Sequence, residues 1–374
     1  MGKKVGIITM HKVINYGSAL QAYALQHVIE KMGHDVEIID YIYPNEYHRQ
    51  FVQKRSVIRR LISYIIDLLK GSPRQKRIKA FEEFYKENLK LSRTYNSKEE
   101  LHKDPPKYDV YMTGSDQVWN PRSIHEDTSF MLSFTDSPNK VAFSASIAKG
   151  EIPEKYKMLY TTELHKYKHI CMREKRGAEL VESLIGYKPE VVLDPTMLLT
   201  GGEWREFAKK SNIDIKQPYI LVYVLGYSFN VYPYIYDLIK HVQQQLNMQL
   251  IVLNMSKQYA QILSNKKIID NANIYDFVKL FANASMVITD SFHGTAFSLS
   301  LNVPFYSVVN NIENADSRIS DLLTSVDEKS RIIRKDTPFT DITISIDAPN
   351  NNKLEIQRKH SMENLSLIIN DERK

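Results

Sequence analysis

The sequence predicts an α/β protein built from two doubly wound, Rossmann-like domains with parallel sheets. Two observations lead to this fold class: short apolar segments alternate with helix-like segments along the chain, and the alternation restarts beyond Pro218. A chain of 374 residues with 43% hydrophobic content is long enough for two separate cores. We therefore expect two sheets that face one cleft.

The first half opens with a β-α-β unit. Lys4–Thr9 is predicted to be a strand, Ser18–Lys31 a helix closed by Gly33, and Asp35–Ile39 the next strand. Four further short strands are predicted in this half: Tyr108–Met112, Val141–Ser144, Ile170–Arg173 and Val191–Leu193.

The second half repeats the pattern after a hinge expected near Thr200–Pro218. Its predicted strands are Tyr219–Leu225, Leu250–Asn254, Met286–Thr289 and Val303–Val309, with helices over Ile274–Ala284, from Gly294, and over Leu354–Ile369. These segments predict an N-terminal domain over residues 1–205, with a helical insertion at about 48–90, and a C-terminal domain over 206–345. Residues 346–374 are expected to form a helix that packs back on the N-terminal domain.

The insertion is strongly basic, because only Asp67 opposes the basic residues between Arg49 and Lys79. Apolar residues from Val57 to Leu69 recur at helical spacing, which predicts a basic amphipathic helix. Such a helix can lie on anionic lipid, or it can pack its apolar face on the domain while its charges face water. No nucleic-acid-binding motif accompanies the charge.

Composition narrows the class of protein further. No apolar run reaches the roughly 18 to 20 residues that span a bilayer, and the charged start leads directly into a strand instead of a signal peptide. We expect a cytoplasmic protein, with peripheral contact at the inner face of the membrane as an option. The single cysteine, Cys171, excludes an intrachain disulfide and a cysteine-cluster metal site, and we interpret it as a buried structural thiol.

The most informative stretch is the polar turn over residues 289–297, which follows a short apolar strand and carries His293. A helix that starts at Gly294 would place the imidazole beside free backbone N–H groups, where an anionic substrate can bind and be protonated. The alternative is structural: Asp290 and Ser291 cap the helix, and His293 satisfies a nearby carbonyl.

Other polar turns follow the predicted strands. In open α/β sheets ligands bind beyond the carboxyl ends of the strands, so these turns form one candidate site. The first turn, Met10–Gly17, lacks the Gly-x-Gly-x-x-Gly fingerprint, which gives no support to a nicotinamide or flavin cofactor. The turns carry His11, Asn15, Gly114, Asp116, Arg173, Asp194 and His293.

Several of these segments, in this order, resemble the polysaccharide pyruvyl transferase family of bacterial enzymes. They are Asn15–Leu25, Thr113–Pro121, Phe143–Ser146, Arg173–Lys175, Leu193–Thr196 and the histidine turn, and they cover most of the chain. The resemblance implies a glycosyltransferase-B-like architecture and transfer of a pyruvyl unit from phosphoenolpyruvate to sugar hydroxyls. It also implies a role in surface polysaccharide biosynthesis, with a lipid-linked oligosaccharide as one option for the acceptor.

One residue departs from the family pattern. Better-understood members read Arg-x-His-Gly in the histidine turn, and that arginine helps to hold the donor, whereas this chain has Ser291. By the resemblance His293 is the proton donor, and a histidine near its ordinary pKa of about 6.5 suits that work. Arg173 is the first candidate for binding the donor, and the helix start at Gly294 and Thr295 is the second. Arg318 could replace the missing cation, or it could form a surface ion pair.

Asp116 or Asp194 is the candidate base for the attacking hydroxyl, although Asp194-Pro195 also reads as a turn. Trp119 is an acceptor-side candidate or a core residue. The other acceptor-side candidates are Asn15, Gly17, Gly114, Gln117 and Asn120. The scheme needs no metal and no cofactor, because phosphoenolpyruvate is a co-substrate. Two alternative functions stay open: a nucleotide-sugar glycosyltransferase of the same fold and a non-catalytic sugar-binding scaffold. The sequence does not fix the oligomeric state, and a homo-oligomer is one option.

Overall fold

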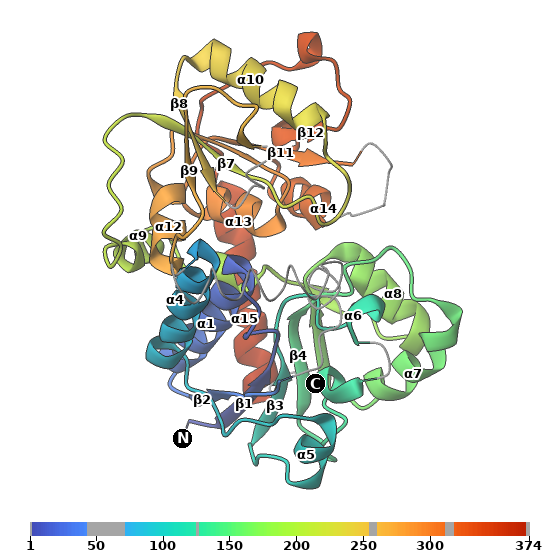
Figure 1. The fold of residues 1–374 in the computed structure, drawn as a ribbon. Helices are drawn as coiled ribbons and strands as arrows, with labels where there is room; N and C mark the ends of the chain where they lie inside the picture. Colours follow the sequence, from blue (N-terminus) through green and yellow to red (C-terminus); the bar gives the residue numbers. More distant parts are fainter. Residues whose placement is uncertain (1, 43–71, 125–126, 254–259, 311–317, 372–374) are drawn as a thin grey trace, which may run out of the picture. The chain divides into compact units, whose positions relative to one another are not determined.

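The computed structural model describes residues 2–42, 72–124, 127–253, 260–310 and 318–371. The chain divides into two compact units, and each contains one six-stranded parallel sheet (Figure 1). Unit 1 consists of Met1–Arg173, Gly177–Val191 and Asn364–Lys374, and unit 2 of Glu174–Arg176 and Val192–Glu363. The predicted fold class, two doubly wound parallel α/β units, is confirmed. Most of the basic insertion predicted at about 48–90 lies outside the described residues.

The sheet of unit 1 has the order β2-β1-β3-β4-β5-β6. Its first and third strands are neighbours, so the chain reverses its direction of travel across the sheet between them. Parallel sheets bind ligands at such a switch point, beyond the carboxyl ends of the two strands. The strands are β1 Lys4–Ile8, β2 Asp35–Ile38, β3 Val110–Thr113, β4 Lys140–Ala145, β5 His169–Met172 and β6 Glu190–Val191.

Helices cover both faces of this sheet. Helices α1 and α4 lie together on one face and α7 and α8 on the other (Figure 1). The crossover from β1 to β2 runs opposite to those from β4 to β5 and from β5 to β6, so right-handed connections put α1 on the face opposite to α7 and α8. Serines cap α4 and α5, with Ser72 accepting from the N–H of Gln75 and Ser97 from that of Glu100. The helices are α1 Tyr16–Lys31, α4 Pro73–Asn88, α5 Lys98–Lys103, α6 Pro121–Ile124, α7 Glu154–Leu164 and α8 Lys175–Ile185, with the 3₁₀ turn η1 Thr128–Met131.

The sheet of unit 2 has the order β12-β11-β10-β7-β8-β9, and its switch point lies between β7 and β10. Pairing of Thr289 with Tyr223 brings the carboxyl ends of these two strands together. The edge strands β9 and β12 are absent from the sequence prediction. The strands are β7 Tyr219–Tyr223, β8 Gln249–Leu253, β9 Lys266–Ile269, β10 Met286–Thr289, β11 Phe305–Val309 and β12 Ile332–Arg334.

Two apolar layers enclose this second sheet. On one face, residues of α10 join the buried side chains of β7, β8, β10 and β11. On the other, Phe277 of α12 packs against Tyr223 of β7 and Phe297 of α13, with ring centroids 5.2 and 5.4 Å apart. The helices of unit 2 are α9 Gly201–Ala208, α10 Tyr234–Leu246, α12 Ile274–Ala282, α13 Phe292–Ser300, α14 Arg318–Ser325 and α15 Asn352–Asn370, with the 3₁₀ turns η2 Pro195–Met197, η3 Lys329–Arg331 and η4 Phe339–Asp341.

The last helix, α15, ends in unit 1. The side chain of Lys3 donates to the carbonyl of Ile369 over 2.7 Å, and Lys168 pairs with Asp371 over 2.6 Å. A cation at the carboxyl end of a helix satisfies carbonyls that have no partner inside the helix. These contacts fasten the last turn of α15 beside the start of β1.

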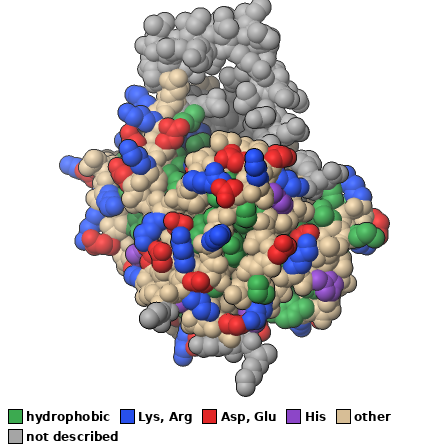
Figure 2. Space-filling view, turned by 90° about the horizontal axis from the view of Figure 1, so that it is seen from below, with side chains coloured by type: hydrophobic (Ala, Val, Ile, Leu, Met, Phe, Trp, Pro, Cys, Tyr) green, Lys and Arg blue, Asp and Glu red, His purple; other side chains and the backbone are tan. Residues whose placement is uncertain are grey.

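The helices and the surface charge of the described residues can be compared with what contact with a membrane would require. None of the helices in these ranges combines the length and the apolar composition that a bilayer crossing needs. Figure 2 shows one face of the molecule, on which Lys and Arg side chains are interspersed with Asp and Glu. Cys171 is buried on β5, as predicted.

Candidate active site

The candidate residues lie in two sets, one at the switch point of each sheet. In unit 2 the set follows β10 and β7 and includes His293. In unit 1 it follows β1 and β3 and includes Asp116.

His293 is the second residue of α13. The helix begins at Phe292, two residues before the predicted start, because the hydroxyl of Ser291 caps it by accepting from the N–H of Gly294 over 3.3 Å. The N–H of Thr295 donates to the carbonyl of Ser291. The N–H groups of Gly294 and Thr295 are therefore engaged within the turn, and the expectation that they are free for an anion is wrong.

Gly294 has a second role in this turn. A Cβ added there would lie 2.3 Å from Oγ1 of Thr289. That same oxygen donates to the carbonyl of Tyr223 and accepts from the N–H of Ser291. Only glycine lets the helix approach β10 this closely, and the close approach fixes where His293 stands.

The partner of His293 is Asp194. Nε2 of His293 lies 3.6 Å from Oδ2 of Asp194, and His293 is 9% exposed while Asp194 is fully buried. This separation is too long for a hydrogen bond but short enough for a strong charge interaction. Nε2 is buried and makes no hydrogen bond to any described residue. The structure thus brings together two of the three predicted catalytic residues.

Asp194 is held in place by Thr196, which the sequence analysis did not single out. Its Oδ1 accepts from the N–H of Thr196 over 3.0 Å and from the hydroxyl of Thr196 over 2.7 Å. The carboxylate caps η2 in this way, which leaves Oδ2 directed at the imidazole. The Asp-Pro-Thr spacing is typical of such a cap, so the signal for Thr196 was present in the sequence.

The turn that carries Asp194 is itself anchored from two helices. The indole N–H of Trp204 donates to the carbonyl of Thr196, and Nε of Arg358 donates to that of Met197. Ser361 accepts from the N–H of Leu193 through its hydroxyl. Helices α9 and α15 therefore set the position of the carboxylate that faces His293.

Asp290 links the two loops at the switch point of unit 2. Its carboxylate accepts from the N–H groups of Leu225 and Gly226, each over 2.7 Å. Burial raises the pKa of Asp290, although these hydrogen bonds favour the ionised form. Ser291 supplies the side-chain cap of α13, and Asp290 holds the loop after β7 beside the start of that helix.

Arg318 lies at the same edge of the sheet. It is the first residue of α14, and its guanidinium donates to the hydroxyl of Ser228 in the loop after β7, over 3.2 Å. Asp290 binds the same loop at Leu225 and Gly226. The location of Arg318 is consistent with its predicted role, which stays a prediction.

Asp116 is the centre of the set in unit 1. It has a φ of 74°, a conformation that costs energy for a residue with a Cβ and is concentrated at functional sites. Oδ2 accepts from the hydroxyl of Ser18 over 2.5 Å, and Oδ1 accepts from the N–H of Gln117 over 2.9 Å. Nη1 of the buried Arg173 lies 3.9 Å from Oδ1. Two predicted site residues, Asp116 and Arg173, are thus an ion pair.

Asn15 and Gly17 are engaged in the start of α1. The amide oxygen of Asn15 accepts from the N–H groups of Gly17 and Ser18 over 2.9 and 3.3 Å. Asn15 is therefore the N-cap of α1, which begins at Tyr16. Gly114 is required by close packing, because a Cβ there would lie 2.9 Å from Cγ2 of Ile7.

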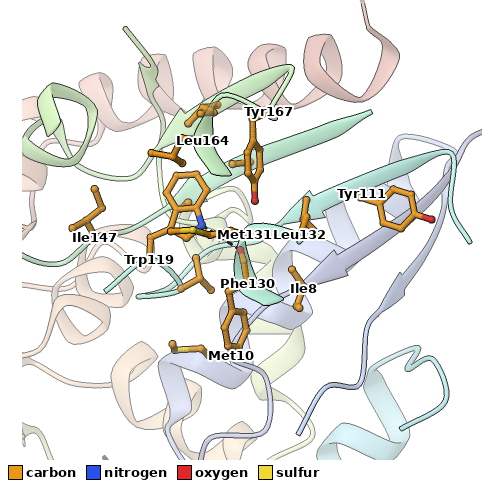
Figure 3. Packing of buried hydrophobic residues seen from close by; sticks show 14 of the residues in the cluster. Ile8, Met10, Tyr111, Trp119, Phe130, Met131, Leu132, Ile147, Leu164 and Tyr167 are labelled. Carbon is orange, nitrogen blue, oxygen red and sulfur yellow. Dashed lines mark hydrogen bonds between the residues drawn. The ribbon is translucent and has the colours of Figure 1, made fainter. Parts of the chain in front are cut away.

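The remaining acceptor-side candidates follow Asp116. The amide of Asn120 donates to the side-chain oxygen of Gln117 over 2.9 Å. Trp119 is fully buried, and its indole N–H donates to the carbonyl of Phe130 over 3.2 Å. Figure 3 shows the ring enclosed by Met131, Ile147 and Tyr167. Trp119 is a core residue and has no face to offer to a sugar, which corrects the acceptor-side prediction for it.

A buried charge cluster stands beside this set. Nδ1 of His11 faces the carbonyl of Thr9 over 3.1 Å, and Nε2 faces Oδ1 of Asp40 over 3.0 Å. Burial raises the pKa of Asp40, but hydrogen bonds from His11, Lys12 and Thr94 outweigh it and hold that pKa well below its usual range. The cluster fastens the loop after β1. Among the described residues no group of three or more His, Cys, Asp or Glu side chains is arranged to hold a metal ion.

Comparisons with known proteins agree with this architecture. A sequence model of the polysaccharide pyruvyl transferase family matches residues 15–312. No curated protein matches the sequence.

Two solved structures are similar to nearly the whole chain. One is a UDP-N-acetylglucosamine 2-epimerase from Rickettsia bellii, with 12% identity, a TM-score of 0.53, and coverage of 99% of this chain and 96% of that one. The other is a UDP-GlcNAc 2-epimerase from Methanocaldococcus jannaschii, with 15% identity, a TM-score of 0.50, and coverage of 95% and 92%. At these identities the likeness extends to the fold alone, which is of the glycosyltransferase-B type.

Proposed function

Because the chain belongs to the polysaccharide pyruvyl transferase family, we propose that it transfers a pyruvyl group from phosphoenolpyruvate to two hydroxyls of a sugar and closes a cyclic ketal. The observation that carries the proposal is the pair formed by His293 and Asp194, 3.6 Å apart at the start of α13. Pyruvyl transfer begins with protonation of a carbon atom, and a histidine with an unsatisfied nitrogen beside a carboxylate is suited to that step.

His293 acts as the general acid in this proposal. Its Nε2 has no hydrogen-bond partner among the described residues, so a proton there is available to a substrate. Oδ2 of Asp194 lies 3.6 Å from that nitrogen, and Thr196 holds the carboxylate in its orientation. This geometry favours Asp194 as the partner of the acid and leaves Asp116 as the candidate base.

Asp116 takes the proton of the attacking hydroxyl. An ionised carboxylate has about four acceptor positions. The hydroxyl of Ser18 and the N–H of Gln117 occupy two of them, which leaves capacity for a sugar hydroxyl. Arg173 is the positively charged group beside this carboxylate, with Nη1 3.9 Å from Oδ1.

The donor carries a carboxylate and a phosphate, so it requires cations or N–H donors. Ser291 has no charge and uses its hydroxyl as a helix cap. We propose Arg318 as the cation that replaces the family arginine, because it contacts the loop after β7 that Asp290 also binds. Arg173 is the second candidate by its match to the family pattern.

The proposed reaction has three steps. His293 gives its proton to the methylene carbon of phosphoenolpyruvate, which breaks the double bond and leaves an oxocarbenium-like centre at C2. A sugar hydroxyl bonds to C2 and loses its proton to Asp116. A second hydroxyl then bonds to the same carbon and closes the ketal, while phosphate leaves with the electron pair of the C2–O bond and takes up the proton of that hydroxyl. In this proposal the acceptor is a precursor of a bacterial surface polysaccharide. A lipid-linked oligosaccharide at the cytoplasmic face of the membrane is the form of acceptor that we propose.

Thermal unfolding of the purified protein tests the donor without knowledge of the acceptor. Phosphoenolpyruvate at a hundred times its dissociation constant should add about 2.7 kcal/mol to the free energy of unfolding. A panel of nucleotide sugars is the comparison, and stabilisation by these alone would replace pyruvyl transfer with glycosyl transfer. Turnover of sugar acceptors by wild type and His293→Ala then separates an enzyme from a sugar-binding scaffold, which has no turnover to lose.

A further inference from the structure

The contact between Ser18 and Asp116 joins residues 98 positions apart in the sequence. Oγ of Ser18 lies 2.5 Å from Oδ2 of Asp116, and both residues are more than nine-tenths buried. A carboxylate accepts and a hydroxyl donates, so the proton lies on Ser18. Short hydrogen bonds to a charged acceptor are the stronger kind.

Asp116 needs such a restraint, because its backbone conformation is unfavourable. Asp116 has a φ of 74°, and Ser144 near the end of β4 also has a positive φ, of 56°. The N–H of Ser146 donates to the carbonyl of Asp116, and the N–H of Arg173 donates to that of Ala145. Neighbouring backbone thus fixes the main chain of Asp116, while Ser18 fixes its carboxylate.

Helix α1 supplies a second tie to the same loop. The side-chain amide of Gln21 donates to the hydroxyl of Thr9 and to the carbonyl of Ser18. The hydroxyl of Thr9 in turn donates to the carbonyl of Ser115, next to Asp116. The first turn of α1 is therefore connected to the loop after β3 at two adjacent residues.

We propose that Ser18 is a positioning residue for Asp116, which aims the carboxylate so that it can take the proton of a sugar hydroxyl. The inference rests on the proposed function for the part that concerns catalysis. Helix capping does not account for the contact, because Asn15 is the N-cap and the Ser18 hydroxyl donates outside the helix. Arg173, directly after β5, is a charged group that faces Asp116.

The test compares Ser18→Ala with Ser18→Thr, which keeps the hydroxyl, and with the control Ser97→Ala. Ser97 caps α5, the helix that precedes β3, so its loss lowers stability without touching Asp116. The first readout is the carboxyl ¹³C titration of Asp116, assigned with Asp116→Asn. Removal of a donor to the charged form should move the titration midpoint to higher pH in Ser18→Ala alone.

The second readout is the kinetics of pyruvyl transfer. We expect Ser18→Ala to lower kcat at least tenfold and to leave KM for phosphoenolpyruvate unchanged. The acid limb of its kcat profile should move to higher pH. Ser18→Thr, which keeps the hydroxyl, should restore most of the rate. A loss of rate in proportion to the unfolded fraction, with an unchanged ¹³C midpoint, would overturn the proposal. If the wild type transfers no pyruvyl group, the proposed function fails, while the ¹³C midpoint still decides whether Ser18 controls Asp116.

Discussion

Nε2 of His293 lies 3.6 Å from Oδ2 of Asp194, and Thr196 holds the other oxygen of that carboxylate through its hydroxyl and its N–H. The two halves of this arrangement come from the turns after β6 and β10. In the proposed reaction His293 gives up one proton per turnover, and Asp194 is the carboxylate that faces it.

Replacement of either partner should therefore impair turnover without unfolding the protein. General acids contribute about 10²- to 10⁴-fold to rate, so we expect a loss in this range for His293→Gln. Asp194→Asn should lower kcat and leave Thr196 able to donate to the remaining oxygen. Steady-state kinetics and thermal unfolding check both variants, and a full rate in His293→Gln would remove it from the catalytic step.

Arg173 and Asp116 form a buried ion pair, and removal of one partner leaves the other charge without compensation. Arg173→Met should lower the free energy of unfolding by about 3–5 kcal/mol in urea denaturation. The matched control is Arg93→Met, which breaks the exposed pairs with Glu100 and Asp104 and should change the midpoint little. Equal effects of the two substitutions would show that burial of the Arg173 pair has no consequence for stability.

Asp40 makes the stability of the chain depend on pH in a defined direction. Its pKa in the folded protein is depressed below the ordinary value of about 3.9 for an unfolded chain. Above that ordinary value the stabilisation is fully present, and it is lost as the pH falls toward the folded pKa. Asp40→Asn should thus lower the free energy of unfolding at pH 7. It should also make that free energy fall less steeply below a pH of about 4. The control Asp104→Asn, at an exposed position, should have neither effect.

The fold could be predicted from the sequence where strands are fully apolar. Met286–Thr289 is buried at every position, and its predicted bounds are those of β10. The edge strands β9 and β12 were missed because only one residue in each is buried, so neither has the continuous apolar run of a central parallel strand. The start of α13 was placed two residues late because Phe292 and His293 lie in the helix behind the Ser291 cap.

Part of the arrangement of the candidate residues could be predicted. A strand followed by a polar turn indicates the carboxyl edge of a sheet, and this rule selected His293, Asp116 and Asp194 as candidates, whose roles stay predictions. It does not distinguish a side chain that faces the edge from one that turns into the core, which is why Trp119 was misassigned. Ser18 meets Asp116 only through the pairing of β1 with β3, and no local pattern carries that information.

Gly294 should tolerate no side chain, because a Cβ would lie 2.3 Å from Oγ1 of Thr289. Overpacking of this kind costs about 1–3 kcal/mol, so Gly294→Ala should destabilise the protein by that amount in urea denaturation. Gly202→Ala is the matched control in a helix: its Cβ would meet only Oγ1 of Thr200 at 3.8 Å, and we expect a neutral or stabilising change. A destabilisation of Gly202→Ala equal to that of Gly294→Ala would refute the steric explanation.

Arg318 should bind the donor if it replaces the cation that Ser291 lacks. Its guanidinium is held at the switch point of unit 2 by the hydroxyl of Ser228, and a charged contact to phosphate contributes to ground-state and transition-state binding alike. Arg318→Ala should accordingly raise KM for phosphoenolpyruvate about tenfold with a smaller change in kcat, and Arg318→Lys should recover part of the loss. Lys353→Ala removes a positive charge that pairs with Asp327 and serves as the control for net charge. If both alanine variants raise KM equally, the effect comes from the overall field of the protein and Arg318 does not touch the donor.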